Sequence, residues 1–331
     1  MKKFWLLASC LLFVGCGYEE VIEEEPVEVI HMRLADTMTG DYPAAAGAVE
    51  FARLVNERSE GRIQIDIYAD GVLGGDEIAY VDQLEFGGID MARVNIANMS
   101  EYEPALNLLQ MGFLYDDEQH LHRVIDSEIG VEMLAMLEDH GFIGLAIYEA
   151  GYRHFYATVP IESIDDLKGM KMRIPYNQLM VDTVTALGAV AVPLAFGDVH
   201  NSIRIGLVDA AGNNFSSYVQ SAHYDVAPYI SLSGHTTLPD LLMCSKVVFD
   251  QLSEEDQLLI RQAALDSVPY QRELYSELEA VAIAELVRLG VDIIELEDRD
   301  AFAETVKPVY EQYMVGYEDF VERINQLRVV D

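Results

Sequence analysis

The sequence predicts an α/β protein that contains two open, mainly parallel sheets. From residue 31 onward, segments with the two-residue period of strands alternate with helical segments. The same alternation is repeated in the middle of the chain. The length of 331 residues, at roughly 150 residues per domain, also indicates about two domains.

The first sixteen residues have the pattern of an export signal. Met1-Lys2-Lys3 is basic and precedes an apolar run over residues 4–15. A helix of this length would rise about 18 Å, short of the roughly 30 Å core of a bilayer, so the run predicts a signal peptide rather than a membrane span. The run ends in Gly15-Cys16 and resembles a bacterial lipoprotein signal. We therefore expect residues 1–15 to be removed and Cys16 to anchor the protein to the membrane through lipid.

Residues 16–30 predict an acidic tether. Six Glu, one Pro and no basic residue occur within residues 17–30, a composition that repels itself and favours an extended chain.

The first α/β unit is predicted from residue 31. Within residues 62–68, Ile63, Ile65 and Ile67 alternate with polar residues, as in a strand with one buried face. The βαβαβ order implies parallel strands. The strands are expected at 31–35, 62–68 and 89–94, and the helices at 44–59 and 76–86, with a turn at 71–75.

The second unit repeats this order and is followed by long helices. Its strands are expected at 143–149, 171–174, 189–193 and 207–211, and its helices at 163–166 (a helix start), 178–187 and 196–206. Acidic residues after Ser253 are typical of a helix start, and they predict a helix over 253–288. A final helix is expected over 302–326.

The charge of the chain excludes several partners. There are 57 Asp and Glu against 21 Lys and Arg, giving a formal net charge of −36. Nucleic acids and anionic membrane surfaces require clustered basic residues, so neither is expected as a partner. With 51% hydrophobic residues, the chain is also too apolar to be disordered. A saline or alkaline exterior would suit such a charge, which remains a hypothesis.

No motif of a catalytic, metal or cofactor site is recognised. The sequence lacks a nucleophile elbow, a Walker loop and a zinc-protease motif. His120 and His122 are two residues apart, so on a helix they cannot bind one metal together, and we expect them to be partly exposed surface residues. Residues 116–118 are acidic but lack the spacing of a calcium loop. These absences favour a binding protein that has no cofactor or metal.

Two arginines form the one group of residues from which a binding site is predicted. Arg153 follows the strand at 143–149, and Arg173 lies in the strand at 171–174. Ligands of open parallel sheets gather outside the carboxyl ends of the strands, where two guanidinium groups would hold a carboxylate. The alternative is that each arginine pairs with a surface acid, and composition alone favours that alternative.

Several separated blocks agree in content and spacing with one family. They are GRIQIDIYADGVLGGDE, QLEFGGIDMARVN, GYRHFYATVPIESIDDLKGMKMRIP, FGDVHNSIRIGLVDAAGNN, SYVQSAHYDVAPYISLSGHTTLPDLLM and LSEEDQ. The chain resembles the solute-binding subunit of TRAP (tripartite ATP-independent periplasmic) transporters. The resemblance implies a non-enzymatic protein that delivers an organic acid to the membrane permease subunits.

The resemblance also implies a type II periplasmic-binding-protein fold, with two α/β lobes around a ligand cleft and long C-terminal helices. The lobes would be residues 31–150 with about 239–279, and residues 151–238 with about 280–331.

The family's site residues carry over by motif. On one lobe, Arg173 matches the arginine that clamps the ligand carboxylate, Arg153 a second arginine, Asn213 an orienting amide and Phe196 an aromatic cleft residue. On the other lobe, the resemblance implies that ligand hydroxyls bind four side chains: Glu77 and Asn95, with Asp240 and His235 as weaker candidates.

The sequence leaves alternatives for both the ligand and the function of the protein. GYRHFY, GNNFSSY and HTTLPD resemble the branch that binds sugar acids such as glucuronate and galacturonate. That branch usually has Glu at positions 212 and 240, where this chain has Gly212 and Asp240. The shorter residues predict a larger or less charged pocket, so dicarboxylates, keto acids and altered sugar acids remain alternatives. A sensor that signals to a membrane kinase, or a secreted enzyme acting on acidic sugars, are the alternative functions.

Overall fold

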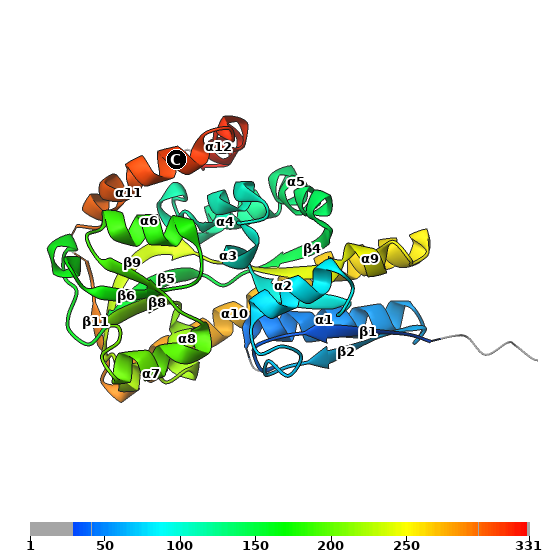
Figure 1. Ribbon diagram of the computed structural model, residues 1–331, viewed down its shortest axis with the longest axis horizontal. Coiled ribbons are helices and arrows are strands. Elements are labelled where there is room, and N and C mark those ends of the chain that lie inside the picture. Colours follow the sequence, from blue (N-terminus) through cyan, green and yellow to red (C-terminus); the bar gives the residue numbers. More distant parts are fainter. Residues whose placement is uncertain (1–28, 41, 297, 330–331) are drawn as a thin grey trace, which may run out of the picture.

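The computed structural model describes residues 29–40, 42–296 and 298–329, which form two α/β lobes side by side (Figure 1). The predicted signal peptide, Cys16 and most of the predicted tether lie outside the described residues. The first lobe is built on a five-stranded sheet. Its strands, in spatial order, are β2 (Ile63–Tyr68), β1 (Ile30–Ala35), β3 (Met91–Asn95), β10 (Asp240–Ser245) and β4 (Phe142–Tyr148).

The second lobe is built on a six-stranded sheet. Its strands, in spatial order, are β11 (Asp292–Ile294), β9 (Tyr229–Thr237), β5 (Tyr152–Ala157), β8 (Ala210–Asn213), β6 (Lys171–Ile174) and β7 (Val190–Pro193).

Each sheet contains one strand that runs against its neighbours. β10 is antiparallel to β3 and β4, and β5 is antiparallel to β8 and β9. Both strands follow the links between the lobes, since residues 149–151 join β4 to β5 and residues 238–239 join β9 to β10. Each of these strands enters its sheet at the edge where a neighbouring strand ends, so it runs in the opposite direction, and the predicted mainly parallel order needs this correction.

Twelve α-helices cover the sheets within the described residues. They are α1 (Pro43–Arg58), α2 (Glu77–Glu85), α3 (Ile96–Met99), α4 (Glu118–Ile125), α5 (Glu128–Met136), α6 (Gln178–Ala186), α7 (Val199–Arg204), α8 (Phe215–Gln220), α9 (Lys246–Phe249), α10 (Glu254–Leu289), α11 (Arg299–Met314) and α12 (Glu318–Gln326). At the start of most of these helices, the side chain of the N-cap residue accepts a hydrogen bond from a backbone N–H of the first turn. For example, Asp76 accepts a hydrogen bond from Ala79 N at the start of α2.

Helix α10 connects the two lobes along its length. It packs on α1 and β4 of the first lobe and on α8 of the second (Figure 1). Ser253 caps its N-terminus, as the acidic run predicts, and Gly290 ends it with a positive φ of 73°. Pro269 lies inside the helix.

Several predicted boundaries differ from the structure. Ile30, which the prediction assigns to the tether, already begins β1. The predicted final helix is two helices, because Gly316 adopts a positive φ of 88° between α11 and α12. Helix α12 packs on α5 of the first lobe, although the predicted division assigns it to the second. We otherwise keep the predicted division into lobes as a proposal.

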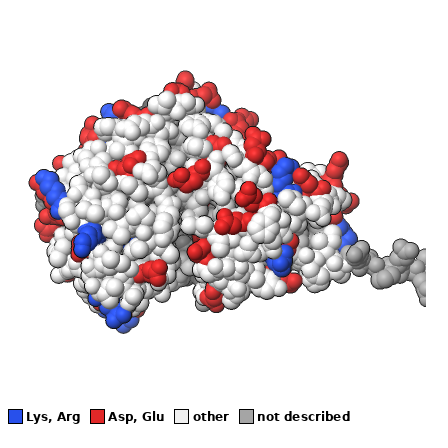
Figure 2. Space-filling view, in the orientation of Figure 1, with Lys and Arg blue, Asp and Glu red and all other residues white. Residues whose placement is uncertain are grey.

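The acidic character is a property of the outside of the molecule. Figure 2 shows many acidic and few basic side chains over one face. Among the described residues, no helix combines the length and the apolar composition that crossing a bilayer requires.

Candidate ligand-binding site

A cavity of about 250 Å³ lies between the two lobes. It is smaller than the pockets of roughly 300–1,000 Å³ that hold drug-sized ligands, so it suits a small solute. Seven of the eight predicted binding residues line it: Arg153, Arg173, Phe196 and Asn213 from the second lobe, and Glu77, Asn95 and Asp240 from the first.

The wall from the second lobe presents two buried arginines. Arg153 is the second residue of β5, and because this strand is reversed, its start meets the end of β8, where Asn213 lies. Arg173 comes from β6 in the same sheet. The sheet topology therefore brings both guanidinium groups to one edge, as predicted, although Arg153 lies within a strand rather than after one.

Backbone and amide oxygens hold the two guanidinium groups in place. Arg153 donates to Asn213 Oδ1 at 2.6 Å and to the Gly212 carbonyl. Arg173 donates twice to the Leu194 carbonyl, at 3.0 and 2.7 Å, and its Cζ lies 5.9 Å from the centre of the Phe196 ring. These contacts fix the orientation of both groups and leave their charges uncompensated.

Neither arginine forms an ion pair with any described residue. Their exposed fractions are only 9% for Arg153 and 5% for Arg173. Burial lowers the pKa of Arg153, and burial together with the neighbouring Arg153 charge lowers that of Arg173 to about 10. The alternative that each arginine pairs with a surface acid is therefore wrong. The arrangement provides a site for an anion.

The wall from the first lobe is organised around a third arginine, Arg93 of β3. Its side chain is 2% exposed and donates to both carboxylate oxygens of Asp36, at 2.9 and 2.5 Å. Its Nη1 lies 3.1 Å from Asp240 Oδ2 and 3.5 Å from Glu77 Oε1. Burial opposes the charge on Arg93, but the three carboxylates outweigh burial and raise its pKa.

Glu77 and Asp240 are held facing the cavity by amide donors. Glu77 Oε2 accepts from Asn95 N at 2.9 Å and from the Asn98 side chain at 2.8 Å. Asp240 Oδ1 accepts from Asn95 Nδ2 at 3.1 Å. Asp240 Oδ2, although close to Arg93, has no aligned hydrogen-bond donor among the residues that the structure describes. Burial raises the pKa of both carboxyl groups. Three carboxylates around one arginine leave this wall rich in acceptors.

The two walls therefore differ in chemical character. The second lobe offers positive, planar donors, which suit a carboxylate. The first lobe offers carboxylate acceptors, which suit hydroxyl groups and would repel a second anionic group. The Phe196 ring adds an apolar surface beside the arginines. A small molecule with one carboxylate end and one hydroxyl-rich end matches both walls.

His235 is the predicted residue that does not line the cavity. It lies behind β8, where its ring stacks on Phe155 at 3.8 Å and its Nδ1 lies 2.8 Å from Ser233 Oγ. A Cβ on Gly212 would lie 2.8 Å from His235 Cε1. The histidine fills the space beside Gly212, so this glycine does not enlarge the pocket. The other predicted alternative, a less charged pocket, stays a prediction.

Sequence reasoning missed Arg93 and its partner Asp36, although signals for both were present. Arg93 lies inside the run 89–94 that is predicted as a buried strand, and a charge on a buried strand requires a buried partner. Asp36 directly follows the first predicted strand, at the edge where ligands gather. Tyr42 also lines the cavity, and its ring centre lies 5.7 Å from Arg93 Cζ. No motif in the neighbouring sequence indicated that it belongs to the site.

Comparisons with known proteins agree with this architecture. The model of the family described as bacterial extracellular solute-binding protein, family 7, matches residues 34–316. A curated solute-binding protein of Chromohalobacter salexigens is 34% identical over 288 residues, which cover 87% of this chain and 85% of that protein.

Two solved structures are similar over nearly their whole length. A TRAP periplasmic solute-binding protein from Bradyrhizobium, in complex with α/β-D-galacturonate, has a TM-score of 0.87 and 35% identity, and the match covers 89% of this chain and 99% of that one. One from Pseudomonas putida, with bound D-glucuronate, has a TM-score of 0.88 and 29% identity, and the match covers 91% and 98%. These matches confirm the predicted two-lobed fold.

Proposed function

This chain belongs to the bacterial extracellular solute-binding proteins of family 7, and we propose that it captures a sugar acid, best a hexuronate, between its lobes. Members of the family bind solutes outside the cytoplasm and do not convert them, so the chain is a binding protein rather than an enzyme. The family's role is to deliver the solute to TRAP membrane permease subunits, the partner we assign to this chain.

The observation that carries the proposal is the contrast between the cavity walls. Arg153 and Arg173 are buried without an acid partner in the described part of the chain, while Glu77 and Asp240 supply acceptors opposite them. A hexuronate has one carboxylate for the arginines and several hydroxyl groups for the acceptors. A dicarboxylate would bring its second charge toward Glu77 and Asp240, so this wall disfavours it.

Binding would proceed by closure of the lobes. In the open state water solvates both arginines, and in the closed state the ligand carboxylate replaces that water. The chain passes between the lobes through the short links at residues 149–151 and 238–239 and along α10, and rotation is expected at the two links. Lipidation of Cys16 would keep the receptor at the membrane surface, close to its permease.

A ligand screen with matched compounds tests the proposal. Thermal unfolding is measured with D-galacturonate, D-glucuronate, D-galactose and succinate. We expect the two hexuronates to raise the melting temperature, since a ligand at 100 times its Kd adds about 2.7 kcal/mol of stability. Galactose has a similar ring without the carboxylate and should give no shift. Stabilisation by galactose equal to that by galacturonate would contradict the carboxylate clamp, and stabilisation by succinate alone would contradict the sugar-acid assignment.

A further inference from the structure

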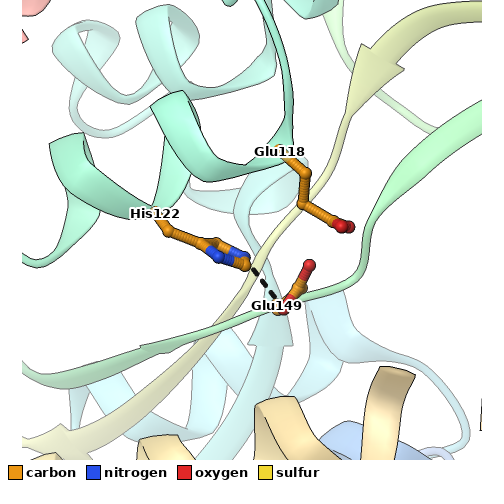
Figure 3. Close-up of side chains that lie close together, drawn as sticks. All are labelled: Glu118, His122 and Glu149. Carbon is orange, nitrogen blue, oxygen red and sulfur yellow. Dashed lines mark ion pairs between the residues drawn. The ribbon is translucent and has the colours of Figure 1, made fainter. Parts of the chain in front are cut away.

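A second group of ligating side chains lies away from the cavity, beside the link between the lobes. Glu118 and His122 belong to α4, and Glu149 directly follows β4 (Figure 3). The three side chains point toward one another, and one ligand atom from each lies within 4.8 Å of the others. None of these residues lines the cavity that holds the proposed solute.

The local fold holds these side chains in position. Glu118 and His122 are four residues apart, so both project from one face of α4. The backbone N–H of Glu149 donates to Gln271 Oε1 at 2.9 Å, and Gln271 Nε2 donates back to its carbonyl at 2.8 Å. Gln271 belongs to α10, so the long helix fixes the backbone from which the Glu149 carboxylate projects.

Polar atoms at the centre of the group lack hydrogen-bond partners. The Glu149 side chain is 4% exposed, and its Oε1 has no donor among the described residues. His122 Nε2 lies 2.9 Å from Glu149 Oε2 but is not aligned for a hydrogen bond. A buried carboxylate oxygen without a donor is costly, so either a cation or a proton is expected at this position.

We propose that Glu118, His122 and Glu149 form a three-ligand site for a divalent transition-metal cation of the zinc class. One imidazole nitrogen and two carboxylates are a donor set that such cations accept, and a solvent molecule would supply the fourth ligand. Tetrahedral bonds of about 2.0–2.2 Å separate ligand atoms by roughly 3.3 Å, so small rotations of the side chains would complete the geometry.

The charges around the group are mostly negative. Asp117, Asp126 and Glu279 lie nearby. Within the group, burial and the neighbouring Glu149 carboxyl raise the pKa of Glu118 to about 8. Arg272 is the opposing cation, but both of its terminal nitrogens are paired with Asp126 at 2.7 Å. A proton shared between Glu118 and Glu149 is the alternative occupant of the same space.

The sequence could not predict this site, because its residues come from separate segments and form no local metal-binding motif. For this reason the sequence led to the expectation of no metal site. Glu149 is 27 residues from His122 in the chain and reaches it only because β4 ends beside α4. The expectation that His120 and His122 are partly exposed surface residues is wrong for His120, which is fully buried and whose Nε2 lies 2.9 Å from the Ile324 carbonyl oxygen. His122 is 23% exposed.

Zinc titration of the full chain, freed of metal by a chelator and carrying no histidine tag, tests the proposal. Calorimetry should detect one equivalent of bound Zn²⁺ with a micromolar or lower Kd. We expect His122→Gln and Glu149→Gln each to weaken binding at least 30-fold. His140→Gln is the matched control, since His140 lies 3.6 Å from Glu103 in an ordinary pair outside the group, and it should bind as the wild type does.

Either of two titration outcomes would overturn the site. One is the absence of stoichiometric zinc binding by the wild type, as expected if a shared proton fills the space. The other is zinc binding that His122→Gln leaves unchanged. If a variant fails to fold, anomalous diffraction from zinc-soaked wild-type crystals decides instead. A peak within about 2.2 Å of the three ligand atoms supports the site, and a crystal without one rejects it. Hexuronate binding is a separate measurement, so failure of either proposal leaves the other standing.

Discussion

The side-chain amide of Asn177 donates a hydrogen bond to Ser100 Oγ at 2.7 Å, across the boundary between the two lobes. The same nitrogen lies 3.2 Å from the Ala97 carbonyl, while Asn177 Oδ1 caps α6 by accepting from Met180 N at 2.9 Å. Asn177 therefore has two separable roles, one inside the second lobe and one between the lobes.

Replacing Asn177 by Asp should separate these roles. The carboxylate keeps the helix cap but cannot donate to Ser100 or Ala97, so the closed state loses about 1–2 kcal/mol. We expect the hexuronate Kd, measured by calorimetry, to rise about 5- to 30-fold while the melting temperature of the unliganded protein stays nearly constant. An unchanged Kd would show that this contact does not stabilise closure.

Arg173→Met should abolish hexuronate binding without weakening the fold. The ligand carboxylate loses a charged partner, so affinity should fall at least 100-fold by calorimetry. Because burial lowers the pKa of Arg173 to about 10, the charge is unfavourable when the lobes are closed on an empty site. The unliganded variant should therefore melt at the same or a higher temperature. Arg288→Met, on an exposed arginine paired only with Glu285, is the control and should bind normally. Tight binding by Arg173→Met would refute the clamp.

Arg93→Met should destabilise the protein by about 3–5 kcal/mol in urea unfolding. The change leaves the carboxylates of Asp36, Asp240 and Glu77 buried without their shared cation. Arg53→Met is the matched control, because Arg53 also contacts two acids but lies 55% exposed on α1. That variant should stay within about 0.5 kcal/mol of the wild type. Equal effects for both variants would mean that the buried network is not structural.

Gly212→Ala should destabilise the protein by about 1–3 kcal/mol, since the new Cβ would meet His235 at 2.8 Å. The double variant with His235→Ala should recover part of this loss, and the coupling is read from a double-mutant cycle. Gly40→Ala is the control, because no atom lies within 4 Å of the Cβ position there. Independent, additive effects would contradict the contact between β8 and His235.

The contributions of His223 and His154 to stability should be lost as the pH falls below about 6.5. Burial lowers the pKa of His223 to about 3 and that of His154 to about 4, so the unfolded chain binds protons that the folded chain refuses. The part of the free energy of unfolding that comes from these two histidines therefore decreases as the pH is lowered through this window. Urea unfolding of His223→Gln should lose about 2 kcal/mol less between pH 7 and pH 5 than the wild type. His31→Gln, at an exposed position, should follow the wild type, and equal slopes in all three proteins would contradict the prediction.

The sequence predicted those helices and strands that are determined by a local pattern of apolar, polar and capping residues. The alternation of residues 62–68 gave β2, and the capped acidic start at Ser253 gave α10. β10 contains the apolar run LLMC between Asp240 and Ser245, and it has no alternation because the sheet is buried on both faces there. The reversed strands also escaped prediction, since their direction depends on which sheet the chain enters next.

The site could be predicted only where family motifs carry it. Arg153, Arg173 and Asn213 lie in such motifs and meet at the cavity. The network around Arg93 and the group at Glu149 depend on contacts between segments far apart in the sequence. A single sequence contains the residues of these groups but not their distances.

The two unpaired guanidinium groups also have a consequence for the economy of transport. If the lobes closed without a ligand, or around a neutral sugar, both guanidinium groups would be removed from water without gaining an anionic partner. Only an acid removes that penalty, so an empty or wrongly filled receptor should spend most of its time open. A permease that engages the closed form would then seldom meet a receptor without cargo, and selection of the solute would already be made before any contact with the membrane.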